Sequence, residues 1–245
     1  MNPPSPLTLQ DDNRRDSAWE RAANYEKEAR SIRQVQKIKV TGTTDVVFFR
    51  SNTPMMFVAG ETQEAIKSVT TSINGDTLLI DRQGGNIVIG RGGSIHVSGS
   101  GNRVSMGDFI GGRGTSGIID AGKVIVGVAL PYAPDVTVSG AADITLYDIA
   151  QQSLELKVSG AGDMVVFGTV GHLIANISGA GDIDAREVTA QEASLNISGA
   201  GDIKASVTNS VKARISGCGN AVIRGNPEHR DTKVSGVGKI KFKKS

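Results

Sequence analysis

VSGAGDM, at residues 158–164, is one of six related heptads that recur through the C-terminal half of the chain. The others are VSGAADI (138–144), ISGAGDI (177–183), ISGAGDI (197–203), ISGCGNA (215–221) and VSGVGKI (234–240). The glycines of the Ser-Gly steps are Gly140, Gly160, Gly179, Gly199, Gly217 and Gly236, at spacings of 20, 19, 20, 18 and 19 residues. A fixed short period of this kind is the sequence signature of a solenoid.

Two weaker copies lie upstream, around Gly42 and Gly99. The step from Gly42 to Gly99 equals three periods, and the step from Gly99 to Gly140 is close to two. One continuous period is therefore predicted from about residue 38 to the C-terminus, with regular repeats over 124–245.

Apolar and polar residues alternate around each corner. Leu154, Leu156 and Val158 alternate with Glu155 and Lys157. This period of two predicts strands with one face in a core and the other in solvent. A unit of about 19 residues is too short for a βαβ crossover, which takes roughly 30 residues. The predicted fold is all-β, a single-stranded parallel β-helix whose Gly-x-Gly corners use backbone angles that other residues avoid.

Stacked coils would place like residues above one another. The Ser row includes Ser159, Ser178 and Ser198, and the acidic row is Asp143, Asp163, Asp182 and Asp202. Carboxylates about 4.8 Å apart repel one another, so hydrogen bonds to the turn or a bound cation such as calcium must offset the repulsion. Turn capping is favoured, because the next two corners carry Asn220 and Lys239 at this position and Lys cannot ligate a cation.

Composition excludes several classes of function. The 27 basic and 25 acidic residues give a net charge of +2, so no overall field for nucleic acid is expected. Cys218 is the only cysteine, which rules out an intrachain disulfide and a cysteine metal cluster. No apolar run is long enough for a membrane span, and the N-terminus lacks the apolar core of a secretory signal. The three histidines, His96, His172 and His229, fall in different coils, and the sequence pairs none of them with a nucleophile.

Residues 1–34 are predicted to form a separate N-terminal arm preceding a β-helix domain at 35–245. Within the arm, 17–34 predict a helix, because Ser17 and Glu20 form a capping box and no Gly or Pro interrupts the segment. Such a helix would plug the open end of the β-helix or dock onto a partner.

The sequence resembles the GIN-domain family, the heads described as autotransporter adhesins of the pectin-lyase-like β-helix class. The resemblance is carried by the opening 35–80 with Asn74-Gly75, by VIVGVALPYAPDVTVSGAADI (124–144) and by GNPEHRDTKVSGVGKIKF (225–242). It implies a two-sheet superhelix, a role in adhesion, a cell-envelope or extracellular location, and no catalytic residues or cofactor.

We therefore expect a non-enzymatic, homo-oligomeric binding module that presents a repetitive polar face to a glycan or protein surface. The main alternative is a structural subunit of a larger particle, docked through the N-terminal arm. A calcium-dependent carbohydrate-active β-helix using the Asp row is the third hypothesis.

Overall fold

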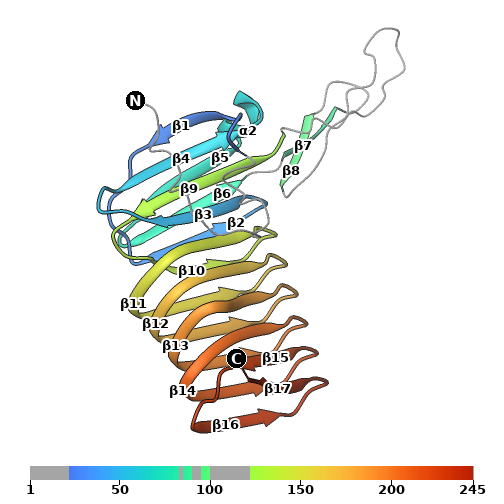
Figure 1. Cartoon of the computed structure of the whole chain (residues 1–245). Helices are drawn as coiled ribbons and strands as arrows, with labels where there is room; N and C mark the ends of the chain where they lie inside the picture. The colour runs from blue at the N-terminus through green and yellow to red at the C-terminus, as the bar shows by residue number, and fades with distance from the viewer. Residues whose placement is uncertain (1–21, 83–84, 90–94, 100–121, 245) are drawn as a thin grey trace.

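The computed structural model describes residues 22–82, 85–89, 95–99 and 122–244. Its regular part is a β-solenoid of long strands stacked along one axis (Figure 1). These strands are β11 (Ile144–Val158), β12 (Met164–Ile177), β13 (Ile183–Ile197) and β14 (Ile203–Ile215). Each pairs in parallel with the next, so that Leu156 pairs with Ala175 and Ala175 with Leu195. The all-β parallel solenoid and its coil of about 19 residues are thus confirmed.

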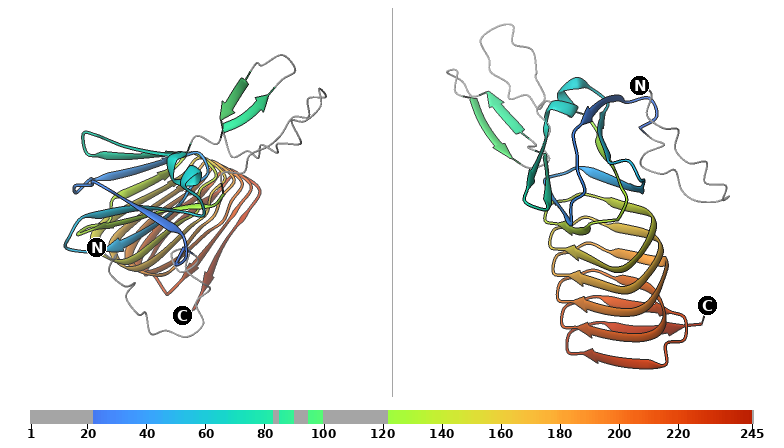
Figure 2. Two further views of the ribbon diagram at one scale, coloured as in Figure 1. Left: turned by 90° about the horizontal axis from the view of Figure 1, so that it is seen from above. Right: turned by 90° about the vertical axis from the view of Figure 1, so that its left-hand side faces the viewer.

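Each long strand bends along its length (Figure 1), and the register of β11, β12 and β13 with the next strand shifts within the strand. The halves before the bends form a first face, which continues through β3 (Asp45–Arg50), β15 (Asn220–Arg224) and β17 (Lys239–Lys243). The halves after the bends form a second face, which continues through β6 (Thr77–Arg82), β2 (Lys37–Thr41), β10 (Asp135–Val138) and β16 (His229–Val234). Figure 2 shows the coils stacked one upon another, and the side chains between the two faces form one core.

Additional elements cover the N-terminal end of the stack. Strand β9 (Val124–Leu130) pairs in parallel with β3, and β4 (Met55–Gly60) pairs antiparallel with β9. Strand β5 (Val69–Asn74) forms a hairpin with β6, turning at Gly75. The short helix α2 (Gln63–Lys67) buries Ala65 and Ile66 in the solenoid core. Strands β7 (Gly85–Ile89) and β8 (Ile95–Gly99) pair antiparallel in a separate sheet.

The hydrophobic core follows from the alternation in the sequence. Leu154, Leu156 and Val158 are fully buried, and the same inward positions recur in the following strands. The core is continuous from Val35 to Ile223, and Ile240 and Phe242 pack against it. No helix in the described part of the chain is long and apolar enough to cross a membrane.

The corner glycines are needed for a different reason from the predicted one. None of the six has a positive φ, so unusual backbone angles do not explain them. Instead, successive corners lie against each other: the Ala180 N–H donates to the Gly160 carbonyl at 2.9 Å. A Cβ on Gly179 would lie 1.9 Å from that carbonyl oxygen, so any side chain would collide with the preceding coil.

The predicted period upstream of Gly140 is confirmed at Gly42 but wrong at Gly99. Gly42 stacks directly against Gly140, whose added Cβ would lie 2.0 Å from the Gly42 carbonyl oxygen. The Ala141 N–H donates to that same carbonyl at 2.9 Å. Gly99 ends β8 in the separate hairpin, so its match to the period is coincidental.

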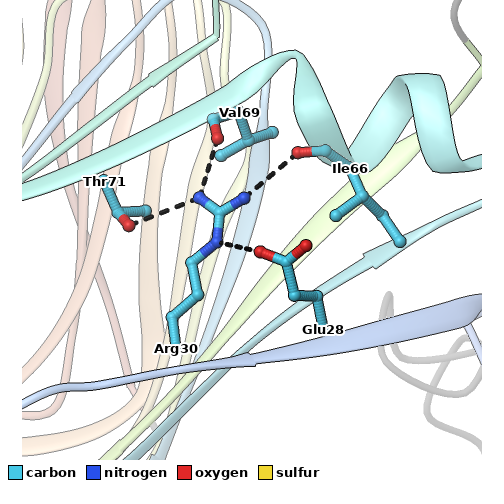
Figure 3. A network of polar contacts seen from close by, with 5 residues as sticks. All are labelled: Glu28, Arg30, Ile66, Val69 and Thr71. Carbon is cyan, nitrogen blue, oxygen red and sulfur yellow. Dashed lines mark hydrogen bonds and ion pairs between the residues drawn. The ribbon is translucent and has the colours of Figure 1, made fainter.

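The helix predicted over 17–34 is wrong for residues 26–30, which form strand β1 (Glu26–Arg30); residues 17–21 lie outside the described part. Strand β1 pairs antiparallel with the outer edge of β4, and this pairing overrides local helix propensity. The Arg30 side chain links β1 to α2 and β5 (Figure 3). Its guanidinium donates to the carbonyls of Val69 at 2.7 Å and Ile66 at 3.2 Å. The end-covering role predicted for 17–34 therefore falls in part to α2 and β1.

Candidate binding face

The second face carries outward polar side chains in register across successive coils. Its three columns are Ser153–His172–Glu192–Ser210–His229, Glu155–Ile174–Ser194–Lys212–Asp231 and Lys157–Asn176–Asn196–Arg214–Lys233. Inward neighbours such as Leu173 and Val211 are buried, which fixes the outward direction of the columns. Apart from Ile174, the columns therefore form a grid of hydrogen-bonding and charged groups spaced by the coil repeat.

A shallow groove of about 490 Å³ crosses this grid at its C-terminal end. Its lining includes His172, Glu192, Ser194, Ser210, Lys212 and His229, which come from four adjacent strands. Glu228 and Asp231 add acidic groups to the lining. A groove with donors, acceptors and both signs of charge suits a polar ligand better than an apolar one.

One histidine of the groove does contact a hydroxyl, contrary to the sequence analysis. The His172 Nε2 lies 3.1 Å from the Ser194 Oγ. In the described residues no carboxylate bonds the other ring nitrogen, so the pair lacks the orienting group of a catalytic triad. The contact positions the imidazole at the groove wall.

Two ion pairs lie on the outer sides of the two faces. Arg214 of β14 donates to the carboxylate of Asp231 on β16 and holds its pKa below the ordinary value. On the first face, burial raises the pKa of Asp184, but hydrogen bonds from the side chain and backbone N–H of Arg186 outweigh it. The pKa of Asp184 is therefore lowered, and that of Arg186 is raised.

The predicted acidic row is brought together at the corners. Asp143 Oδ1 accepts from the Asp163 N–H at 3.1 Å, and Asp163 Oδ1 from the Asp182 N–H at 2.8 Å. Asp182 Oδ1 in turn accepts from the Asp202 N–H at 2.7 Å. One carboxylate oxygen in each coil is thus bonded to the backbone of the next coil.

Asn220 continues this row, because both its backbone and its side-chain amide donate to Asp202 Oδ1, at 2.7 and 3.0 Å. Within 22–82, 85–89, 95–99 and 122–244, no group of three or more His, Cys, Asp or Glu side chains has an arrangement that could hold a metal ion. The Ser row is exposed, and Ser198 Oγ reaches the Ile177 carbonyl only at 3.4 Å. Cys218 is exposed at its corner, where its N–H bonds to Gly199.

A family model described as "Putative auto-transporter adhesin, head GIN domain" matches residues 35–227. The chain belongs to this GIN-domain family. No curated protein matches its sequence. The GIN-domain assignment agrees with the two-face solenoid described above.

Solved structures share the fold of this GIN-domain chain. A putative adhesin from Bacteroides fragilis NCTC 9343 has a TM-score of 0.61 at 16% identity, over 89% of this chain and 96% of that one. A structure described as a putative lipid binding protein from Parabacteroides distasonis ATCC 8503 has a TM-score of 0.53 at 18% identity, with the same two coverages. At these identities the similarity shows the fold alone.

The groove of this GIN-domain chain was not predicted from the sequence. His172, Glu192, Ser210 and His229 follow one another at steps of 20, 18 and 19 residues, which are the steps of the corners. Aligning the outward positions by coil, rather than only the corner heptads, would have placed them in one column. The pairing of the strands places these residues, which are far apart in the sequence, on one surface.

Proposed function

We propose that this GIN-domain protein is a non-enzymatic adhesion module located at the cell surface. It binds a glycan or protein surface through the polar columns of its second face. The observation that carries the proposal is the groove of about 490 Å³, where polar side chains from four strands converge. The adhesin descriptions of the family and of a structural neighbour agree with this role.

The surface is suited to many weak contacts. Its polar groups repeat at the coil spacing of about 4.8 Å, so an extended ligand could engage several coils at once. Several contacts of this kind, made on one rigid scaffold, add up to a usable affinity. Flexible loops are not required, because the side chains of the three columns are fixed to strands of the solenoid.

The calcium-dependent enzyme hypothesis receives less support. One oxygen of Asp143, Asp163, Asp182 and Asp202 already accepts a backbone hydrogen bond, which supports turn capping. The adhesion proposal uses none of these carboxylates. It requires neither a cofactor nor a catalytic residue.

A glycan array and a whole-cell binding assay test the proposal. We expect the protein to bind, and His172→Ala combined with Lys212→Ala to weaken binding at least tenfold, because both side chains line the groove. The control combines Thr189→Ala with Gln191→Ala, two exposed residues at the bend of β13. Equal binding by both double variants would remove the groove from the proposal, and failure to bind any surface would refute the adhesion role.

The structural-subunit alternative is tested by truncation. Because β1 belongs to the sheet, the deletion must stop at residue 21 and not at residue 35. The alternative predicts a defined oligomer that dissociates when residues 1–21 are removed. We expect the truncated chain to keep its oligomeric state and its surface binding, as measured by light scattering and the same binding assay.

A further inference from the structure

Charge is distributed very unevenly along the solenoid. Residues 143–202 hold nine Asp or Glu and two Lys or Arg, whereas residues 203–245 hold two Asp or Glu and ten Lys or Arg. The net charge of +2 conceals this asymmetry, because the two parts nearly cancel. The last coils therefore carry a strong local positive charge, and a cluster of one sign attracts oppositely charged partners.

Five of these cations share the first face at its C-terminal end, where β14, β15 and β17 lie side by side (Figure 1). This basic face consists of Lys204, Arg224, Lys239, Lys241 and Lys243. Lys241 lies next to Val222, which lies next to Lys204, and Lys243 pairs with Arg224. Ile240 and Phe242 pack against the core, so the three lysines that alternate with them point outward.

The charges of the basic face are not neutralised within the described residues. None of the five side chains has a hydrogen bond or ion pair there, although Lys204 is near enough to lower the pKa of Asp184. Other cations are engaged: Arg214 binds Asp231, and Arg230 donates to Asn226 and lies 4.2 Å above the Phe242 ring. The basic face is thus a surface whose charges remain available for an external anion.

The spacing of the charges favours a linear anion. Alternate residues of a strand are about 6.8 Å apart, and neighbouring strands about 4.8 Å apart. Lys239, Lys241 and Lys243 therefore form a line of like charges that repel one another by roughly 0.6 kcal/mol per neighbouring pair in water. A chain of regularly spaced anionic groups lying along β17 would relieve this repulsion at each position.

The side chains of the basic face favour a polysaccharide over a single-stranded nucleic acid. Binding of single-stranded nucleic acid relies on aromatic side chains on which bases stack. Here the apolar outward residue is Val222, and the nearby ring of Phe242 faces the core beneath Arg230. A polysaccharide bearing sulfate or carboxylate groups needs only the cations.

We propose that the basic face formed by Lys204, Arg224, Lys239, Lys241 and Lys243 binds an anionic polysaccharide. This inference rests on the proposed adhesion role and names the chemical class of one of its ligands. Binding occurs through ionic contacts to sulfate or carboxylate groups along β17. It uses the first face and is separate from the groove on the second face.

The test measures binding of the full chain to heparin, hyaluronate, neutral dextran and a single-stranded DNA oligonucleotide over a range of salt concentrations. Heparin carries sulfates and hyaluronate only carboxylates, so the two separate the anionic groups. We expect binding to heparin or hyaluronate that weakens with salt, as counterion release requires. The variant Lys239→Gln, Lys241→Gln and Lys243→Gln should weaken it at least tenfold and reduce the salt dependence.

The matched control removes the same charge elsewhere, through Lys37→Gln, Lys39→Gln and Lys67→Gln, three exposed lysines near the N-terminal end. This control should bind as the unaltered protein does. An equal loss in both triple variants, or no loss in the β17 variant, overturns the proposal. The single variant Lys241→Gln, expected to weaken binding two- to fivefold, serves if the triple variant does not fold.

Two further outcomes are decisive. If DNA binds as tightly as heparin, with the same dependence on Lys239, Lys241 and Lys243, the face recognises any polyanion and the polysaccharide assignment is wrong. If the protein binds cells or neutral glycans but no anionic polysaccharide, this inference fails while the adhesion role stands. Absence of binding to every glycan, cell and protein surface removes both.

Discussion

The Asp163 carboxylate accepts a hydrogen bond from the backbone N–H of Asp182, 2.8 Å away in the next coil. The same bond links each Asp of the row to the following corner, so the acidic row joins coil to coil. A side chain that would repel its neighbours if left in water instead anchors a backbone amide. Asn220 shows that an amide fits this position without the charge.

Replacement of Asp163 separates hydrogen bonding from charge. Asp163→Asn keeps an acceptor oxygen and relieves repulsion, so we expect the free energy of unfolding to change by less than about 0.5 kcal/mol. Asp163→Ala leaves the Asp182 N–H without its acceptor and should destabilise the protein by about 1 kcal/mol. Urea denaturation of both variants, with and without calcium, measures these effects. A calcium-dependent rise in stability that Asp163→Asn abolishes would favour a cation site instead.

Substitution at a corner glycine should be severe. In Gly179→Ala the added Cβ would lie 1.9 Å from the Gly160 carbonyl oxygen, and the coil above cannot move without breaking its backbone bonds. We expect a loss of about 3 kcal/mol or more, or failure to fold. Ala180→Ser is the control, because Ala180 is exposed at the same corner. Thermal unfolding of the two variants gives the comparison, and similar melting temperatures would contradict the close-packing explanation.

Substitutions at core and surface positions of one strand should change the free energy of unfolding to very different extents. Leu156 is fully buried within β11, so Leu156→Ala should lower the free energy of unfolding by about 2–5 kcal/mol. Lys157 is exposed and lies on the outer side, so Lys157→Ala should change it by less than about 0.5 kcal/mol. Chemical denaturation measures both. Comparable effects would mean that the assigned strand register is wrong.

Because Arg186 lowers the pKa of Asp184, we expect this ion pair to add to the free energy of unfolding by an amount that depends on pH in the acid range. The pKa of Asp184 in the folded protein lies below its ordinary value of 3.8, so the folded state favours the ionised carboxyl. The stabilisation is therefore present above about pH 3.8 and is lost as the pH falls through the lowered folded pKa. Asp184→Asn should destabilise the protein by up to about 1 kcal/mol at pH 7, as expected for a partly exposed ion pair.

The difference in free energy of unfolding between the unaltered protein and Asp184→Asn should decrease below pH 3.8 and reach zero at lower pH. Urea denaturation at pH 7, 4, 3 and 2 gives the profile. Thr189→Ala is the control, because it changes no titrating group. A difference that stays constant down to pH 2 would show that the Arg186 contact does not lower the pKa of Asp184.

Much of the architecture was predictable because it depends on local pattern. The spacing of the heptads gave the coil length, and alternation such as Leu154, Leu156 and Val158 gave the inward side of each strand. A parallel stack converts a sequence period directly into spatial register, which is why the members of the Asp row could be named in advance. The position of Asn220 in the same row also followed from the period.

Other features depended on contacts between distant segments. The prediction of a helix at 26–30 failed because pairing with the edge of β4 outweighs local propensity, and Gly99 matched the period without joining the stack. The groove forms because β12, β13, β14 and β16 lie side by side. The basic face forms because β14, β15 and β17 lie side by side.

The sequence by itself thus determined the coil, its corners and its buried side, since each arises from residues close together in the chain. The tertiary structure decided why the corners must be glycine, what covers the N-terminal end, and which polar residues share a surface. These properties depend on the close approach of one coil to the next. In this stack, backbone hydrogen bonds bring Gly179 against Gly160 and leave no space for a Cβ.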